Sequence, residues 1–339
     1  MRQLEGLAVA WRFKSRSSTV EVNSLSARGD AREMTSMINL LRKIYSNIPI
    51  IRELGKIHEE LKQLKAVENA RLKAELEAQT ARLLQDPRYA DPRSLSRYAA
   101  QAFSQSGEDG MIAEIFRRIG TRSRTFLEIG IGNGLENDTV ALLAHQQWRG
   151  HWIDGNTANV ERVRRHFAKP VAEGRLTVEQ SLVTAANVGE TLRRLGVPEE
   201  LDLFSLDIDR NTYWVWEALP QLKPRVVVVE YNATVPPEID WRVDYVSDRG
   251  WNGTTYFGAS LKAFELLGRR LGYNLVGCTL NGVNAFFVRD DVCGDRFEQP
   301  YTAEHHYEPP RYYLTYRTSH PSSFTDDSTA PGSPWVPGV

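Results

Sequence analysis

The chain has 339 residues, enough for one large domain with an appendage or for two domains. Its formal net charge is -1, which gives no general electrostatic reason to bind nucleic acid or an anionic membrane. The two cysteines, Cys278 and Cys293, exclude a disulfide framework, and no cysteine/histidine cluster has zinc spacing, so a reduced, cytoplasmic protein is expected. A stretch of about 18 apolar residues is absent from the sequence, and no membrane span is predicted.

Four segments follow one another along the sequence. Residues 1–33 are polar and serine-rich, which is typical of disorder. Residues 34–97 are predicted to form a helical arm, because apolar residues recur at helical spacing and good helix formers follow them. Pro49 should kink or split this helix. Residues 98–295 are predicted to form the main domain, and residues 296–339 a C-terminal extension with a disordered end.

The arm has two interpretations. Its apolar stripe suits a coiled coil that pairs two chains, so a homodimer through the arm is one expectation. The stripe equally suits a helix folded onto its own domain, because the apolar spacing is not a strict heptad over its whole length.

Strand-like and helix-like segments alternate through the main domain, which indicates an α/β fold with a largely parallel sheet. Only "LNG" and its neighbours separate the last two apolar runs, which is typical of a hairpin. The predicted fold is therefore doubly wound, with a mostly parallel seven-stranded sheet that ends in a C-terminal antiparallel hairpin. The predicted strands are 125–130, 150–154, 175–181, 202–208, 225–231, 272–278 and 283–289, and the helices between them include 107–119, 137–147, 157–168 and 187–195.

The first predicted strand runs into a glycine-rich turn, "TFLEIGIGNGLENDT". The dinucleotide fingerprint needs its third glycine where this chain has Leu135, and the triphosphate-loop pattern is absent too. Glu128 precedes the turn; its charge disfavours a pyrophosphate but not an aminoacyl sulfonium. Asp154 ends the next strand, where an acid suits ribose hydroxyls. The alternatives are a tight turn with no ligand and an acid that caps a helix.

At these residues a resemblance to a known fold emerges. Strand, EIGxGxG, helix, strand and Asp, followed by an "LDID" strand and a terminal hairpin, resemble the class I S-adenosylmethionine-dependent methyltransferases over residues 103–290. "SQSGEDGMIAEIF" is similar to the segment that precedes the core of FkbM-type methyltransferases, although the glycine motif there begins with Asp and often reads "GAN". The resemblance implies S-adenosylmethionine, with its methionine part surrounded by Glu128, Gly130, Gly132 and Gly134, its ribose at Asp154, and its adenine near Ser181 and Leu182.

Polar residues follow the fourth and fifth predicted strands. Asp207 and Asp209 share one side of the fourth, and Glu230 and Asn232 share one side of the fifth. Ligands of doubly wound sheets bind outside the carboxyl ends of the strands, so these four side chains are expected to converge.

Two chemistries would use such a group. A carboxylate of Asp207 or Asp209 can act as a general base toward an acceptor hydroxyl or amine. Alternatively, all four side chains bind Mg²⁺, which prefers oxygen ligands. That arrangement partly resembles metal-dependent catechol O-methyltransferases, although Tyr231 separates the second pair here. A purely structural role is also open, in which Asp209 caps a helix and Glu230 pairs with an arginine such as Arg210 or Arg225.

The predicted function is methyl transfer from S-adenosylmethionine to oxygen, less favourably nitrogen, of a small molecule or glycan. The segment 232–261 is long for a loop and rich in aromatic and polar residues, which suits a sugar or a flat ring and equally suits a loop that packs its aromatic residues on the core. The alternative is a catalytically inactive binding or scaffold protein that keeps the fold. A nicotinamide enzyme is disfavoured by Leu135 and Glu128.

Overall fold

The computed structural model describes residue 39 and residues 49–315. The predictions for residues 1–33, for the effect of Pro49 on the preceding helix and for the end of the C-terminal extension therefore lie outside the described residues. Among the helices that the structure does describe, none combines the length and the apolar composition needed to cross a membrane.

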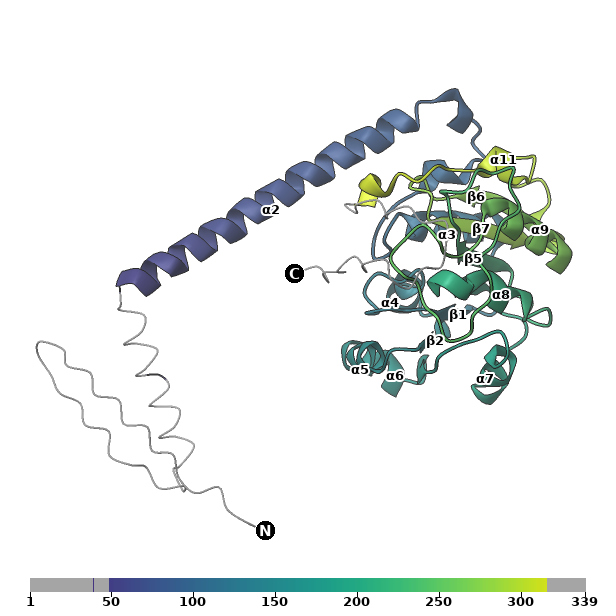
Figure 1. Cartoon of the computed structure of the whole chain (residues 1–339), viewed down its shortest axis with the longest axis horizontal. Coiled ribbons are helices and arrows are strands. Elements are labelled where there is room, and N and C mark those ends of the chain that lie inside the picture. Colours follow the sequence, from purple (N-terminus) through teal and green to yellow (C-terminus); the bar gives the residue numbers. More distant parts are fainter. Residues whose placement is uncertain (1–38, 40–48, 316–339) are drawn as a thin grey trace, which may run out of the picture. The chain divides into compact units, whose positions relative to one another are not determined.

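The chain divides into two compact units, Met1–Glu75 and Leu76–Val339. One long helix, α2 (Pro49–Leu83), passes from the first unit into the second (Figure 1). All side chains of residues 53–75 are exposed, so this stretch is held by its own backbone hydrogen bonds and by its helix-forming residues. Two short 3-10 helices, η1 (Pro87–Tyr89) and η2 (Leu95–Tyr98), then lead to the α/β part of the second unit.

The second unit is built on a seven-stranded sheet with the order β3-β2-β1-β4-β5-β7-β6. Neighbouring strands from β3 to β5 are parallel, whereas β7 is antiparallel to both β5 and β6. This arrangement confirms the predicted fold class, including the closing hairpin. The strands are β1 (Thr125–Ile129), β2 (Arg149–Asp154), β3 (Leu176–Gln180), β4 (Leu203–Leu206), β5 (Val226–Glu230), β6 (Tyr273–Cys278) and β7 (Asn284–Arg289).

Helices cover both faces of the sheet, because the central strands are apolar on both sides. In β5, Val227 and Val229 join one buried cluster, and Val226 and Val228 join the other. The first cluster packs against α7 (Val188–Arg194), α8 (Thr212–Glu217) and α9 (Leu261–Leu271). The second packs against α3 (Glu108–Ile119), α4 (Val140–His145) and α5 (Thr157–His166). The shorter elements are α6 (Ala168–Ala172), η3 (Asp209–Asn211), α10 (Asp290–Cys293), α11 (Ala303–His306) and η4 (Tyr312–Thr315).

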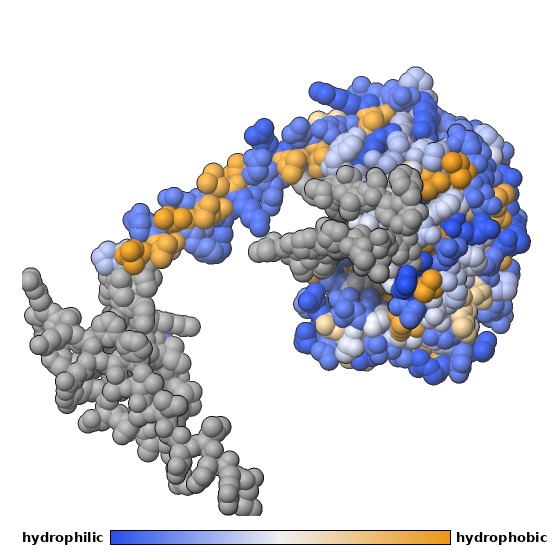
Figure 2. Space-filling view, viewed as in Figure 1, coloured by the Kyte–Doolittle hydropathy of each residue, from blue (hydrophilic) through white to orange (hydrophobic). Residues whose placement is uncertain are grey.

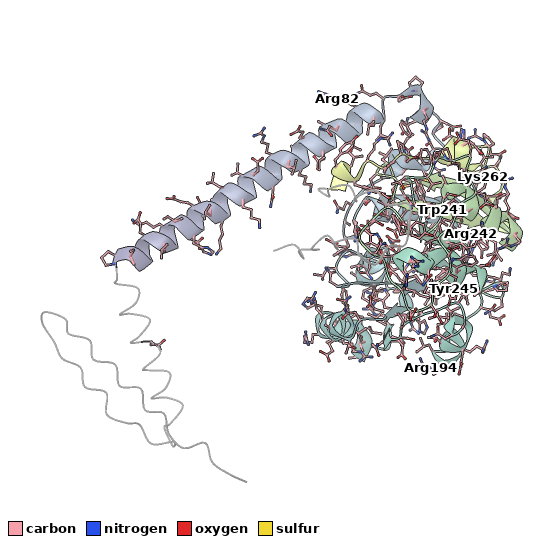
Figure 3. All side chains as sticks on the ribbon, viewed as in Figure 1. Arg82, Arg194, Trp241, Arg242, Tyr245 and Lys262 are labelled. Carbon is pink, nitrogen blue, oxygen red and sulfur yellow. The ribbon has the colours of Figure 1, made fainter. Side chains whose placement is uncertain are left out.

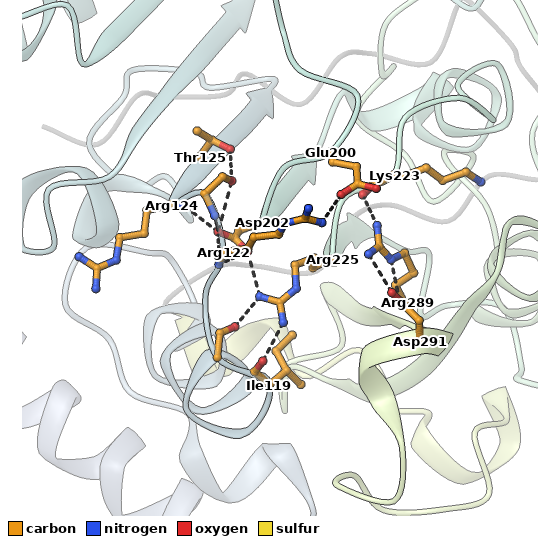
Figure 4. Close-up of polar contacts among 12 residues, drawn as sticks. Ile119, Arg122, Arg124, Thr125, Glu200, Asp202, Lys223, Arg225, Arg289 and Asp291 are labelled. Atoms are coloured by element: carbon orange, nitrogen blue, oxygen red, sulfur yellow. Dashed lines mark hydrogen bonds and ion pairs between the residues drawn. The ribbon is translucent and has the colours of Figure 1, made fainter.

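The amino-terminal edge of the sheet is fixed by Asp202, which is fully buried just before β4. Its carboxylate accepts the backbone N–H groups of Arg122 (3.0 Å), Ser123 (2.8 Å) and Arg124 (2.6 Å). It also forms an ion pair with Arg225 (3.0 Å), which lies just before β5 (Figure 4). One side chain thus joins the starts of three neighbouring strands, and the carboxyl-terminal edge is left for the candidate site.

Candidate active site at the carboxyl ends of the strands

The three glycines of the turn after β1 have positive φ angles, at 92° for Gly130, 51° for Gly132 and 78° for Gly134. Their surroundings differ. A Cβ atom at Gly130 would lie 1.6 Å from the carbonyl oxygen of Asp207, and one at Gly134 would lie 2.5 Å from Cγ2 of Val163. A Cβ atom at Gly132 would meet no described atom within 4 Å. Two glycines therefore allow close packing, and Gly132 is the one whose backbone faces open space.

Asp154, at the end of β2, connects the turn after β1 with the turn after β2. Its Oδ2 accepts the N–H of Gly132 (2.8 Å), and its Oδ1 accepts the N–H of Asn156 (2.7 Å). The cap of α5 is Asn156 rather than Asp154, because the Asn156 side chain accepts the first free N–H groups of that helix. The carboxylate of Asp154 is consequently placed beside the open backbone of Gly132.

Leu182 follows β3 on the neighbouring turn and is 61% exposed. A Cβ atom at Gly155 would lie 3.3 Å from Cδ1 of Leu182, so this side chain adjoins the segment that Asp154 begins. The N–H of Ser181 donates to the carbonyl oxygen of Asp154 (2.9 Å). The structure thus brings together Gly132, Asp154 and the exposed apolar side chain of Leu182.

Glu128 lies beneath the turn instead of beside open space. Its carboxylate is buried and accepts the N–H of Asp138 (2.9 Å) and the hydroxyl of Thr139. The Thr139 oxygen in turn accepts the indole N–H of Trp152 (2.8 Å). Burial raises the pKa of Glu128 to about 7, against its ordinary 4.5. Glu128 therefore holds the segment that precedes α4. The helix predicted over 137–147 is correspondingly shorter in the structure, where α4 covers Val140–His145.

Asp138 is a further acid at the site, and the sequence analysis missed it. Its Oδ2 accepts the hydroxyl of Ser205 on β4 (2.7 Å). Burial and the nearby carboxylates of Glu108 and Glu128 raise the pKa of Asp138 well above its ordinary value. Glu108 is itself fully buried and accepts from the amide of Asn284 (2.8 Å). Glu108 in "SQSGED" and Asp138 in "ENDT" are acids close to the predicted core in sequence, but only the fold shows that their carboxylates lie near each other.

Three of the four predicted carboxyl-end groups converge. Asp207, Asp209 and Glu230 each offer an oxygen, and these oxygens all lie within 4.8 Å of one another. Asp209 has a φ of 57°, which is unusual for a residue other than glycine and is typical of strained functional positions. The group comes from the ends of adjacent parallel strands, as the sequence analysis expected.

The structure does not bring Asn232 into this group. Its side chain is fully buried, and its Nδ2 donates to the carbonyl oxygens of Thr255 (2.8 Å) and Phe257 (2.9 Å). Its Oδ1 accepts the N–H of Thr234 (3.1 Å). Asn232 therefore braces the long loop that follows β5. Arg225, one suggested partner of Glu230, instead pairs with Asp202 at the opposite edge of the sheet.

Comparison with known proteins gives matches among solved structures alone. No family model matches the chain, and no curated protein matches it. A S-adenosylmethionine-dependent methyltransferase from Aquifex aeolicus is 11% identical, with a TM-score of 0.33, over 52% of this chain and 88% of that one. Magnesium protoporphyrin IX methyltransferase from Synechocystis, with bound S-adenosylmethionine, is 14% identical, with a TM-score of 0.35, over 54% of this chain and 77% of that one. The [4+2]-cyclase SpnF is 10% identical, with a TM-score of 0.34, over 52% of this chain and 63% of that one. At such scores these matches decide neither reaction nor site, and the likeness to FkbM-type methyltransferases stays a prediction.

The loop between β5 and α9 is fastened beside the acidic group. The indole N–H of Trp214 donates to the carbonyl oxygen of Val243 (2.9 Å), and the Asn211 amide donates to that of Val246 (2.9 Å). Between these two attachment points, the hydroxyl of Tyr245 accepts the N–H of Ala185 (3.2 Å), close after β3. Figure 3 labels Trp241, Arg242 and Tyr245 on this loop. The loop therefore reaches from η3 and α8, which follow β4, to the turn after β3 that carries Leu182.

Two aromatic rings of this loop are partly exposed, and one of them contacts the residue that follows Asp209 in the chain. Trp241 and Tyr256 meet edge to face, with ring centroids 5.6 Å apart. The guanidinium of Arg210, next to Asp209 in the chain, lies 5.7 Å from the centre of the Tyr256 ring. Aromatic faces beside hydrogen-bonding groups suit a sugar or a flat ring.

Proposed function

We propose that the protein transfers the methyl group of S-adenosylmethionine to a hydroxyl, less favourably an amine, of a small molecule or glycan. One observation carries this proposal: the left-handed backbone of Gly132 faces open space beside the carboxylate of Asp154. Bare backbone next to an acid at the end of the second strand suits a nucleoside ligand, whose ribose hydroxyls such an acid can accept. The absence of both phosphate-binding glycine patterns disfavours a nucleotide cofactor.

In this proposal the cofactor supplies an electrophilic methyl group, and the protein supplies alignment and a base. Gly132 and Asp154 would hold the methionine and ribose parts, and the exposed Leu182 side chain would cover the adenine. Asp207 or Asp209 would take the proton of the acceptor hydroxyl as its oxygen attacks the methyl carbon, and the methyl–sulfur bond would break to leave S-adenosylhomocysteine. Holding the two reactants in line provides much of the rate gain in such a transfer.

The same carboxylates support a second role, as ligands of Mg²⁺. Asp207, Asp209 and Glu230 fit a hard cation, because their oxygens are mutually within 4.8 Å and Mg²⁺ prefers carboxylate and water ligands. A cation there would orient the acceptor hydroxyl and lower its pKa. Asn232 is left out of this ligand set, because its amide is already bound within the loop.

Calorimetric titration of the full chain with S-adenosylhomocysteine, with and without Mg²⁺, tests both roles. We expect micromolar binding that Asp154→Ala abolishes. Asp207→Asn/Asp209→Asn should retain this binding and remove any effect of Mg²⁺. Glu200→Gln, which changes an exposed acid at the opposite edge of the sheet, should leave both unchanged. If folded protein does not bind, the methyltransferase proposal fails and a scaffold role is favoured.

A further inference from the structure

Helix α2 carries a stripe of large apolar side chains that are exposed to solvent. Ile50, Leu54, Ile57, Leu61 and Leu64 are between 45% and 69% exposed. Figure 2 shows hydrophobic residues following one another along this helix. Contiguous exposed apolar surface of this kind marks an interaction site.

The spacing of the stripe says what kind of partner it fits. Its members are separated by four, three, four and three residues, which is the a/d spacing of a coiled coil. The two leucines Leu54 and Leu61 then occupy a positions, and Ile50, Ile57 and Leu64 occupy d positions. Leucine at a with isoleucine at d shifts the preference from two strands to higher numbers, three or four. We propose that α2 assembles with the α2 helices of three further copies of this chain into a parallel, in-register four-stranded coiled coil.

The flanking charges favour the parallel orientation. In this frame Glu53 and Glu60 occupy g positions, and His58 and Lys65 occupy e positions. A parallel bundle sets each g residue against the e residue five positions later in a neighbour, so Glu60 faces Lys65 and Glu53 faces His58. An antiparallel bundle would set the glutamates against each other. The present i,i+3 pair of Glu53 with Lys56 is largely exposed and leaves both side chains able to turn.

The repeat also shows where the bundle ends. After Leu64 the next a and d positions are Glu68 and Arg71, which pair with each other along their own helix (3.9 Å). Val67 and Leu72 take the g and e positions there, so they would pair as apolar neighbours at the rim of the bundle. The seam within the described residues therefore runs from Ile50 to Leu64.

The mass of the full chain in solution, measured by light scattering after size exclusion, tests the number of strands. We expect four times 38.5 kDa for the natural protein and the mass of a single chain for Leu54→Lys/Leu61→Lys. The control Glu59→Gln/Ala66→Lys changes the net charge by the same +2 at outward f positions and should keep the larger mass. An unchanged melting temperature of the second unit shows that the variants are folded. A natural protein of any other mass, or a Leu54→Lys/Leu61→Lys variant that stays assembled, would overturn the proposal.

Disulfide formation tests the orientation independently. Cys278 and Cys293 are both buried, so an introduced cysteine is the reactive one. Leu64→Cys should give cross-linked pairs under oxidation, because in-register parallel helices set each Leu64 beside its copies. Ala66→Cys, on the outer face, should give few. Equal cross-linking of both variants, or none for Leu64→Cys, would exclude the parallel register.

Discussion

A Cβ atom at Gly132 would meet no described atom within 4 Å, whereas one at Gly130 would overlap the carbonyl oxygen of Asp207. Two residues in the same short motif thus restrict the chain for different reasons. Gly130 lets β1 and β4 end side by side, which is a requirement of the fold. Gly132 has no packing contact in the described part of the chain that would exclude a side chain, and its open surface is where we propose that the ligand binds.

We expect Gly132→Ala to weaken S-adenosylhomocysteine binding at least about tenfold, because the methyl group enters the proposed ligand space. Gly174→Ala is the matched control, since Gly174 also has a positive φ (67°) and open surroundings but lies in the exposed turn before β3. Both variants should lose about 1 kcal/mol of unfolding free energy from backbone strain. Equal affinity of the two in calorimetry would remove Gly132 from the ligand site.

Asp202 is the residue whose loss should cost the fold most at the opposite edge. Asp202→Ala leaves three backbone N–H groups and Arg225 without their acceptor, so we expect the unfolding free energy to fall by about 3 kcal/mol in urea titration. Glu200→Ala removes an exposed partner of Arg122 from the same neighbourhood and should cost less than about 1 kcal/mol. A similar loss in both variants would contradict the role given to Asp202.

At the scale of elements, the strands and the closing hairpin were predictable because their apolar runs and turn residues are local. All seven predicted strands are present, each with bounds within two residues of those expected. The contacts of Asp202 were not predictable, because they link segments that only the strand order brings together. Those of Glu128 and Asn232 stay within the β1–α4 and β5–α9 connections, whose irregular backbone has no periodic sequence pattern. Alternation placed Asp207, Asp209 and Glu230 on one edge, but it could not show that Asn232 turns away after β5 ends.

Helix α2 contains one residue that weakens it without an evident packing reason. Gly55 lies in the helix interior, and a Cβ atom there would meet no described atom within 4 Å. Gly55→Ala should therefore stabilise the helix by about 0.5 to 1 kcal/mol, and Ala66→Gly, also outside the apolar seam, should destabilise it by a similar amount. Circular dichroism at 222 nm during heating measures both, and melting that moves the same way in the two variants would contradict this account.

Among the buried groups, Glu128 and His306 give opposite responses to pH, and Asp138, whose pKa is also raised by burial, acts in the same direction as Glu128. The pKa of Glu128 is raised to about 7, so its stabilising contribution is complete below pH 4.5 and is lost as the pH rises through 7. The pKa of His306 is lowered to about 3, mainly by burial, so its contribution is complete above pH 6.5 and is lost as the pH falls. Between pH 8 and pH 5 the two changes largely cancel.

Single variants should separate these contributions. Relative to the natural protein, Glu128→Gln should gain about 2 kcal/mol of unfolding free energy from pH 5 to pH 8, because glutamine never ionises. Relative to the natural protein, His306→Gln should gain about 2 kcal/mol of unfolding free energy as the pH falls from 8 to 5, because glutamine does not take up a proton. Urea titrations at both pH values measure these differences, and a pH-independent difference for either variant would contradict the assignment.

The position of β7 between β5 and β6 affects how the chain folds during its synthesis on the ribosome. The apolar strand β5 finds its outer partner only in residues 284–289, far later in synthesis than its inner partner β4. Until those residues emerge, the nascent sheet ends in an open, valine-rich border that is able to pair with other unfinished chains. A ribosomal stall or nonsense codon before Asn284 would therefore yield an aggregation-prone fragment, even though every strand up to β5 and the residues of both proposed binding sites had already been made.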